Sequence, residues 1–264
     1  MSQKIDFITY GDSSKYSISK KHIIGLAKES NFFDKCVPYN FNDLDTQFKK
    51  EFEEILMFER GGGFYLWKLG LIEKHLSTIK DNDILVYSDS GSSFNYKAKE
   101  RFKDYIEILN DSNFGNLRFE SKKEHVEKKW TTRELFDYFN IDLNSDIANA
   151  TQLLGGHLLF KKNEHTFNFL NEFKNVIKYD NKLITDFYSR NQIDEFIENR
   201  HDQSIMSLIS KLYGGEILEN ETFFSANSKE QINYPFLSVR HYGHGLKDKI
   251  RYKFGYKKKT PIYF

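Results

Sequence analysis

The sequence predicts an α/β protein with a mixed, mostly parallel sheet flanked by helices. Three observations lead to this fold class. The chain opens with an apolar strand pattern, a helical pattern and a second strand pattern, which is the usual beginning of a parallel sheet. Further helical patterns precede the next apolar strand. Two of the strands end in short loops of small and polar residues, where ligands bind in open α/β sheets.

The N-terminal elements follow from their hydrophobic spacing. Residues 4–11 (KIDFITYG) become an apolar run that stops at a glycine, so we expect a strand there. Residues 17–30 predict a helix, and residues 32–40 predict a second short strand. The apolar spacing of the helix is carried by Ile18, His22, Ile23, Leu26 and Ala27.

The next part of the chain predicts two helices and a strand. Residues 41–58 have a helical pattern, with Asp43 or Asp45 as the N-cap. Three glycines at 61–63 interrupt it, and a second helix is expected over 64–79. Residues 82–89 (NDILVYSD) then predict a buried strand.

Later patterns complete the expected domain. Residues 152–162 predict a loop and a strand, residues 163–179 a helix, and residues 194–214 a helix with a polar start. Neither an internal repeat nor a long linker is visible, so we expect one domain over 1–264. Its last segment, about 247–264, is basic and aromatic.

Composition excludes several classes of function. With 39 basic and 38 acidic residues, the chain has no overall field that would favour nucleic acid, and we expect no nucleic-acid partner. Cys36 is the only cysteine, which excludes an intrachain disulfide and a cysteine-based zinc cluster. The N-terminus lacks a signal-peptide pattern, and no apolar run approaches the ~18 residues of a membrane span. We therefore expect a soluble, cytoplasmic protein.

A lone carboxylate follows the strand at 82–89. Asp89 begins the small, polar loop DSGSS, on which a hard cation such as Mg²⁺ or Mn²⁺ has room to bridge to substrate phosphates. The same aspartate could instead only start an Asx-turn. Polar or glycine-containing breaks also occur at residues 9–12 and 201–203, and the fold class brings strand-end breaks to one edge of the sheet.

Five motifs, read in order, resemble a known family. They are ITYGD, RGGGFYLWK, DNDILVYSDSG, GGHLLFKK and NRHDQSIMSLISKLYG. Together they resemble bacterial and large-virus glycosyltransferases of the GT-A fold from polysaccharide gene clusters, and more distantly the glycogenin and lipooligosaccharide galactosyltransferase group. The resemblance covers roughly residues 5–247. It implies a Rossmann-type sheet and an enzyme of polysaccharide biosynthesis that moves a sugar from a nucleoside diphosphate, UDP in the first instance, to a glycan or lipid-linked acceptor.

The resemblance also implies roles for single residues. Arg60 and Lys68 would approach the donor diphosphate, with the glycines between them letting backbone N–H groups come close to phosphate. Asp202 and Gln203 match the family's D-Q motif at the reaction centre. The base and ribose would be lined by Thr9, Tyr10 and Gly11, and the donor sugar by Gly155, Gly156 and His157.

The expected metal site departs from the family pattern. Asp89 stands where the D-x-D motif begins, but the third position is Gly91. In the distant group a C-terminal histidine completes the metal shell and a lysine six positions later holds phosphate, a spacing that His241 and Lys247 reproduce, with His244 as an alternative ligand. We expect Mn²⁺ or Mg²⁺ to bind Asp89 and His241. Because Gly91 leaves this site with one carboxylate fewer than the family pattern, basic residues could take over part of the metal's role.

Asp202 is the expected base if the enzyme inverts configuration at the transferred sugar, because an acceptor hydroxyl must then lose a proton. In a retaining enzyme it would orient the sugar instead. We expect the helix that starts here to lower the pKa of Asp202 and keep it ionised. The alternative is that Asp202 only caps the helix.

Other readings of the chain stay open. A sugar-phosphate nucleotidyltransferase would use the same residues, but it needs a basic, glycine-rich loop after the first strand, whereas YGDSSKYS has one glycine. A non-catalytic carbohydrate- or membrane-binding module would rely on aromatic surface and the basic tail. Trp130 is a candidate sugar-stacking platform or a core residue. The tail at 247–264 predicts weak, peripheral contact with anionic membrane.

Overall fold

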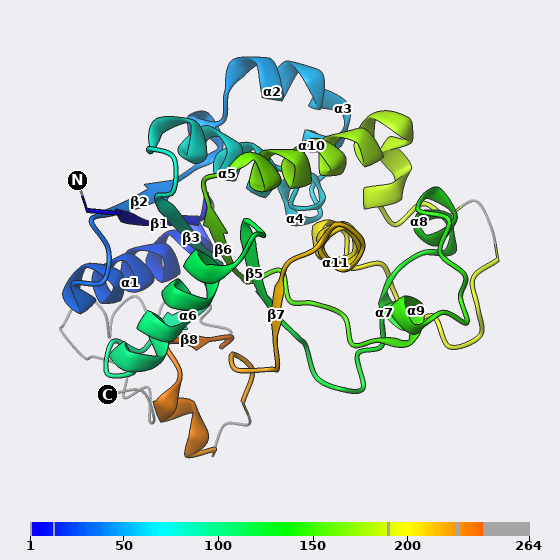
Figure 1. Ribbon diagram of the computed structural model, residues 1–264. Coiled ribbons are helices and arrows are strands. Elements are labelled where there is room, and N and C mark those ends of the chain that lie inside the picture. The colour runs from blue at the N-terminus through cyan, green and yellow to red at the C-terminus, as the bar shows by residue number, and fades with distance from the viewer. Residues whose placement is uncertain (1, 13, 189–190, 225–227, 240–264) are drawn as a thin grey trace.

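Figure 1 shows the computed structural model, which describes residues 2–12, 14–188, 191–224 and 228–239. In these residues a central sheet has six strands in the order β2-β1-β3-β6-β5-β7. Strands β2, β1 and β3 are mutually parallel, β6 is antiparallel to both of its neighbours, and β7 is parallel to β5. The predicted mixed, mostly parallel α/β sheet is confirmed. The strands are β1 (Ile5–Tyr10), β2 (Lys35–Tyr39), β3 (Ile84–Ser88), β5 (Asn116–Phe119), β6 (His157–Lys161) and β7 (Glu216–Leu218).

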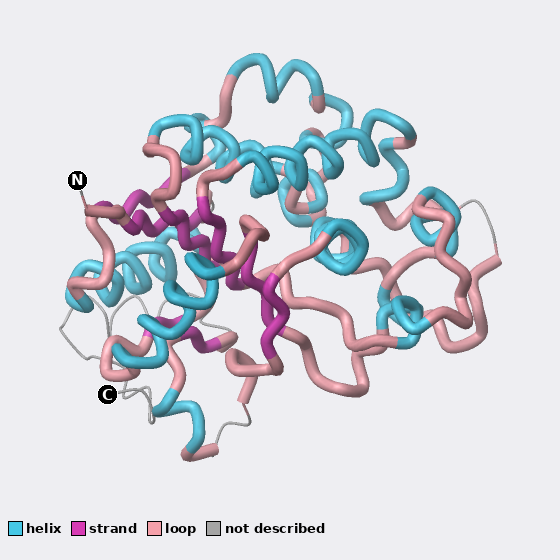
Figure 2. The backbone as a smooth tube through the Cα atoms, in the orientation of Figure 1, coloured by secondary structure: helices cyan, strands magenta, loops and turns pink. Residues whose placement is uncertain are grey.

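Helices cover both faces of this sheet (Figures 1 and 2). One face packs against α2 (Thr46–Glu51), α3 (Glu53–Leu56), α5 (Trp67–Thr78) and α10 (Glu164–Tyr179), and the other against α1 (Ser14–Ser30) and α6 (Lys99–Asp111). Alternate strand residues enter the two cores, as the pleat requires: Leu85 and Tyr87 lie in the first and Ile84 and Val86 in the second. Both cores are therefore anchored on β3, the strand that leads to Asp89.

The remaining elements are short, apart from one helix. That helix is α11 (Asp202–Tyr213), which is seen almost end-on in Figure 1. A small second sheet pairs β4 with β8. The short elements are β4 (Ser93–Phe94), β8 (Phe236–Leu237), α4 (Gly61–Phe64), α7 (Glu127–Trp130), α8 (Arg133–Tyr138), α9 (Asp146–Asn149) and the 3-10 turns at Phe41–Asp43, Asn181–Ile184 and Glu230–Asn233.

The single helix expected over residues 41–58 is wrong. The segment is a 3-10 turn followed by α2 and α3: two caps set the starts of the turn and of α2, and the non-helical backbone of Phe52 (φ −117°, ψ 25°) separates α2 from α3. Asn40 and Asp43 form a reciprocal capping box around the turn. Asp45 then caps α2 by accepting from the N–H groups of Gln47 and Phe48, so of the two expected N-caps it is Asp45 that begins a helix.

The helix expected over 194–214 begins only at Asp202. Before it, the N–H groups of Ile197 and Arg200 donate to the carbonyls of Lys129 and Trp130, so at these two positions the backbone pairs with α7 and not with a preceding turn of its own helix. His201 has φ 54° and ψ −121°, a conformation in which a helix cannot continue. The helix expected over 64–79 likewise starts late, at Trp67, because the glycine turn before it is left-handed.

The sheet topology places the candidate site. Ile8 pairs with Tyr87 in the parallel β1–β3 ladder, so both strands end at the same edge. Ser88 pairs with His157 in the antiparallel β3–β6 ladder, so β6 begins where β3 ends. Residues 155–156, which precede β6, are thereby carried to the loop at Asp89. Within the described residues, none of the helices is both long and apolar enough to span a bilayer.

Candidate active site

A buried charge cluster lies at this edge of the sheet. The Nζ of Lys68 is 2.6 Å from Oδ2 of Asp202 and 3.6 Å from Oδ1 of Asp89. The side chains of Lys68 and Asp202 are only 4% and 6% exposed, whereas that of Asp89 is 49% exposed. Asp89 is therefore the most exposed side chain of the cluster, and the Lys68–Asp202 pair is largely buried behind it with a small part of its surface accessible.

Three different elements hold the cluster together. Lys68 comes from α5, Asp89 follows β3, and Asp202 is the first residue of α11. The loop before β6 links them, because Gly155 accepts from Nζ of Lys68 at 2.9 Å and Gly156 accepts from the backbone N–H of Asp89 at 2.8 Å. A Cβ on Gly156 would lie 3.2 Å from Oδ2 of Asp89, so a glycine lets this loop come close to the carboxylate.

Burial and charge oppose each other in the Lys68–Asp202 pair. Burial lowers the pKa of Lys68, but the carboxylates of Asp202 and Asp89 outweigh it and the net pKa is raised, so Lys68 remains an ammonium. Burial raises the pKa of Asp202, and Lys68 only partly offsets this. The backbone N–H of Gln203, in the first turn of the helix, lowers the pKa of Asp202 as expected, but desolvation outweighs it, so the expectation of a net lowered pKa is wrong.

Tyr87 supports Asp89 from the strand. Its hydroxyl donates to Oδ1 of Asp89 at 2.6 Å. Burial, and after it the charge of Asp89, raise the pKa of Tyr87 well above its usual range, so it stays a donor. Tyr87 was not among the predicted site residues, although a strand period of two places its side chain on the same side as that of Asp89.

Asp202 is not the N-cap of α11. That position belongs to His201, which makes no side-chain capping bond and has a positive φ that is uncommon for residues other than glycine. The His201 ring is fixed by a 2.8 Å hydrogen bond between Nδ1 and the carbonyl of Ile184, and burial lowers its pKa. Backbone strain of this kind concentrates at functional sites.

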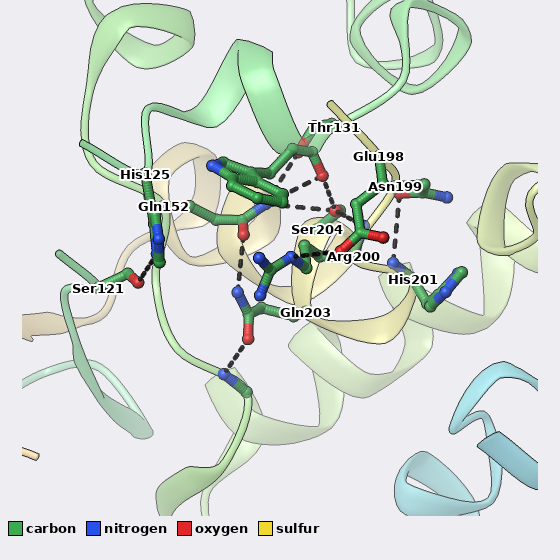
Figure 3. Close-up of polar contacts among 12 residues, drawn as sticks. Ser121, His125, Thr131, Gln152, Glu198, Asn199, Arg200, His201, Gln203 and Ser204 are labelled. Atoms are coloured by element: carbon green, nitrogen blue, oxygen red, sulfur yellow. Dashed lines mark hydrogen bonds and ion pairs between the residues drawn. The ribbon is translucent and has the colours of Figure 1, made fainter. Parts of the chain in front are cut away.

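Gln203 is oriented by a chain of buried amides (Figure 3). Its Oε1 accepts from the N–H of Gly155 at 3.0 Å, and its Nε2 donates to Oε1 of Gln152 at 2.7 Å. Gln152 in turn donates to the buried carboxylate of Glu127 at 3.1 Å. Because a carboxylate only accepts here, Glu127 sets which way both amides face. Gln152 and Glu127 were missed, since nothing local in the sequence connects them to Gln203.

The glycine turn departs from the expectation that its backbone N–H groups would bind phosphate. The N–H groups of Gly62 and Gly63 donate to the carbonyls of Glu59 and Phe58, within the turn itself. In this conformation these two N–H groups are therefore already paired and do not point to a phosphate. The guanidinium of Arg60 is half exposed and lies 2.9 Å from Asp186 and 3.5 Å from Glu198.

The residues expected near the nucleotide base lie at the end of β1. Tyr10 stacks on Trp67 with ring centroids 3.7 Å apart and 21° between the planes. Thr9 is buried, and its hydroxyl has no hydrogen-bond partner among the described residues. Gly11 has no room for a side chain, since a Cβ would meet the carbonyl of Tyr16 at 3.0 Å.

His157 and Trp130 are each held by neighbours. His157 is fully buried, its Nδ1 is 2.9 Å from the hydroxyl of Ser88, and burial lowers its pKa to about 3, so it is neutral and presents no surface to a sugar. Trp130 is half-buried, and the guanidinium of Arg200 lies 3.8 Å from its ring centroid. One face of this candidate platform is therefore covered.

Only part of the expected metal site lies among the described residues. His241, His244 and Lys247 fall outside the described residues, as does the tail at 247–264. Inside them, no group of three histidine, cysteine, aspartate or glutamate side chains is arranged to hold a metal. Of the predicted metal ligands, Asp89 is the one that the described residues include. Its half-exposed carboxylate fits a cation that is also held by substrate phosphates.

The fold and the cluster define a class of protein: an α/β protein with a largely buried charge cluster at the ends of its parallel strands, the edge where ligands bind in open α/β sheets. The chain is similar to the crystal structure of a glycosyltransferase involved in the glycosylation of the major capsid of PBCV-1. That likeness has a TM-score of 0.51 at 10% identity and covers 95% of this chain and 98% of the other. The GT-A-like glycosyltransferase fold that the sequence resemblance implied is confirmed.

Two further solved structures are more distantly similar. Mouse xyloside xylosyltransferase 1 in its apo form has a TM-score of 0.48 at 12% identity, covering 83% of this chain and 73% of that one. The galactosyltransferase LgtC, in complex with donor and acceptor sugar analogues, has a TM-score of 0.42 at 11% identity, covering 83% and 75%. Neither a protein-family model nor a curated protein sequence matches the chain.

Proposed function

We propose that this protein is a glycosyltransferase that moves a sugar from a nucleoside diphosphate, UDP in the first instance, to a glycan or lipid-linked acceptor. The observation that carries the proposal is the buried Lys68–Asp202 pair directly beneath the half-exposed Asp89. Burying an ammonium and a carboxylate costs free energy, which a purely structural site could avoid with apolar side chains. The fold shared with the capsid-modifying glycosyltransferase supports the same class of reaction.

The charge of the cluster affects how the diphosphate of the donor can bind. Lys68 is the one basic side chain of the cluster and faces two carboxyl groups, those of Asp89 and Asp202, so the cluster offers a diphosphate no surplus of positive charge. Positive charge must therefore accompany the donor. We assign that role to Mn²⁺ or Mg²⁺ on Asp89 and His241, together with Lys247 and with Arg60, which would have to exchange its carboxylate partners Asp186 and Glu198 for phosphate. A divalent cation there would supply charge stabilisation to the departing nucleoside diphosphate.

The protein's own residues perform the remaining tasks. Tyr10, stacked on Trp67, offers a flat surface for a nucleotide base. Lys68 fixes the carboxylate of Asp202, which accepts the acceptor hydroxyl's proton in an inverting reaction or orients the donor sugar in a retaining one. Gln203 fixes Gly155, so the loop that faces Asp89 stays in place.

The rival functions explain less of the site. A sugar-phosphate nucleotidyltransferase needs a basic glycine-rich loop after the first strand, and β1 is followed by a single glycine, Gly11, before α1. A non-catalytic carbohydrate- or membrane-binding module gives no reason for the buried Lys68–Asp202 pair. Product analysis separates them, because only the proposed reaction releases UDP from a UDP-sugar.

Binding of UDP is the first expected result. A thermal-shift screen of nucleoside diphosphates and UDP-sugars, with and without Mn²⁺ or Mg²⁺, should single out UDP. At 100 times its Kd the ligand should stabilise the protein by ~2.7 kcal/mol. If no nucleoside diphosphate raises the melting temperature or gives calorimetric heat at millimolar concentration, the glycosyltransferase proposal fails.

Peripheral membrane contact is a separate part of the proposal, supported by the basic and aromatic sequence at 247–264. Each lysine or arginine near an anionic surface contributes ~1 kcal/mol. Deleting residues 257–264 should therefore lower co-sedimentation with vesicles that contain phosphatidylserine, most strongly at low salt. Equal binding by truncated and full-length protein would remove the membrane from the list of partners.

A further inference from the structure

The glycine turn before α5 is a run of left-handed backbone that continues into two aromatic residues. Gly61, Gly62 and Gly63 have φ of 61°, 61° and 91°, and Phe64 and Tyr65 follow with 50° and 65°. Glycine adopts such angles freely, but a side chain makes them unfavourable. Strained backbone of this kind is kept where the surrounding structure demands it, and often where it serves a site.

The turn needs its glycines because Tyr65 folds back onto it. A Cβ on Gly61 would meet three carbon atoms of the Tyr65 ring at 2.7–2.9 Å. The indole N–H of Trp67 donates to the carbonyl of Gly61 at 2.8 Å and holds that end of the turn. At Gly63 a Cβ would lie 2.6 Å from the Cα of Leu56, which locks the turn onto α3. These contacts fix the turn and hold the Tyr65 ring against it.

The two aromatic residues that follow the turn have different surroundings. Phe64 is buried, with its ring 5.0 Å from that of His201. Tyr65 is 39% exposed, its ring centroid is 5.8 Å from Nζ of Lys68 and 6.1 Å from the His201 ring. Burial, and after it the Asp202 carboxylate, raise the pKa of the Tyr65 hydroxyl, which places this residue within the field of the charge cluster.

We propose that Tyr65 forms one wall of a sugar-binding subsite at the mouth of the Lys68–Asp89–Asp202 cluster. This inference rests on the proposed glycosyltransferase function. An aromatic ring offers an apolar face and, in tyrosine, a polar edge, which suits a hexopyranose with its C–H and hydroxyl faces. The sugar is either that of the donor or that of the acceptor, and both present the same ring chemistry.

The test compares binding of UDP, of UDP-glucose and UDP-galactose, and of methyl hexopyranosides added to the UDP-saturated protein, by calorimetry on the full chain. Tyr65→Ala should weaken the sugar ligands by up to about tenfold, because aromatic contacts of this kind are worth roughly that much. Binding of UDP itself should stay unchanged, and Tyr65→Phe should keep most of the affinity if the ring face is what matters.

The turn provides a matched pair of controls. Gly61→Ala and Gly62→Ala each place a side chain on backbone with the same unfavourable φ of +61°. Only Gly61→Ala displaces the Tyr65 ring, because at Gly62 the nearest atoms belong to Trp67 at 3.7 Å. We expect Gly61→Ala to weaken sugar binding as Tyr65→Ala does, and Gly62→Ala to bind sugars like the wild type even if its melting temperature falls equally.

The outcomes separate the two proposals. A loss confined to the UDP-sugars assigns the wall to the donor, and a loss confined to the hexopyranosides assigns it to the acceptor. If the wild type binds these sugars and Tyr65→Ala binds them equally well, or if UDP weakens in step with them, the subsite is refuted while the enzyme class stands. A wild-type protein that binds none of the UDP-sugars refutes both.

Discussion

Replacing Asp202 by asparagine is expected to lower kcat by about 10²–10⁴-fold while leaving UDP binding nearly unchanged. The carboxylate lies at the start of α11 and pairs with Lys68, whereas we propose that the base binds at Tyr10, so the substitution changes the group assigned to the sugar and leaves the residues assigned to the base intact. Steady-state turnover and calorimetry with UDP measure the two quantities. Turnover at the wild-type level would remove Asp202 from the reaction.

The same substitution also bears on stability, because it leaves the ammonium of Lys68 buried with Asp89 as its remaining carboxylate partner at 3.6 Å. Breaking a buried pair costs about 3–5 kcal/mol. The double variant Asp202→Asn with Lys68→Met removes both charges and should regain much of the stability without regaining activity. If activity returned together with stability, the role of Asp202 would be structural.

The pH profile gives an independent check on Asp202. Burial raises its pKa above the ordinary value for aspartate of about 4. A base must be ionised, so kcat/KM should rise as the pH increases through this raised pKa, and the acid limb should lie above pH 4. An acid limb at the ordinary carboxylate value would instead point to an exposed group.

Replacing Asp89 by asparagine is expected to abolish turnover and leave the fold intact. The side chain is half exposed, and the amide oxygen of asparagine can still accept from Tyr87, so little packing or hydrogen bonding is lost. What disappears is the negative charge of Asp89, which we propose holds the cation that accompanies the diphosphate. The enhancement of UDP binding by Mn²⁺ or Mg²⁺ should vanish together with activity.

Asp81→Asn serves as the matched control for Asp89→Asn. Asp81 lies just before β3, at the opposite end of the strand, and is 85% exposed with Lys162 at 3.6 Å. We expect it to keep both activity and the metal effect on UDP binding. Unchanged activity in Asp89→Asn would show that the DSGSS loop is only a turn and that Asp89 has no part in the reaction.

Local patterns predicted the elements that are regular and amphipathic or fully apolar. The strands at 4–11, 32–40, 82–89 and 152–162 and the helices at 17–30 and 163–179 all occur, with ends shifted by a few residues. Residues 95–151 received no assignment, although they contain α6, β5 and three short helices. Short helices such as α7 and α9 are held by tertiary contacts, so little in their own sequence marks them.

Part of the candidate site was visible before the fold was known. Strand-end logic predicted that Asp89 would sit at the carboxyl edge of the sheet, and the structure brings it together with Gly155, Gly156, Asp202 and Gln203. Antiparallel β6 accounts for the two glycines, since its first residue pairs with the last residue of β3. Sequence alone contains no signal for that strand direction.

By itself, then, the sequence determined the α/β class, the strand-end loops and the candidate carboxylates, because periodicity and turn chemistry are local properties. Tertiary structure alone decided that Lys68 pairs with Asp202 and that Arg60 faces Asp186. It also decided that the N–H groups of Gly62 and Gly63 bond within the chain and that Gly61 packs against the Tyr65 ring. The physical reason is that a charge's partner, its burial and hence its pKa depend on groups that are distant in the chain and meet only after packing.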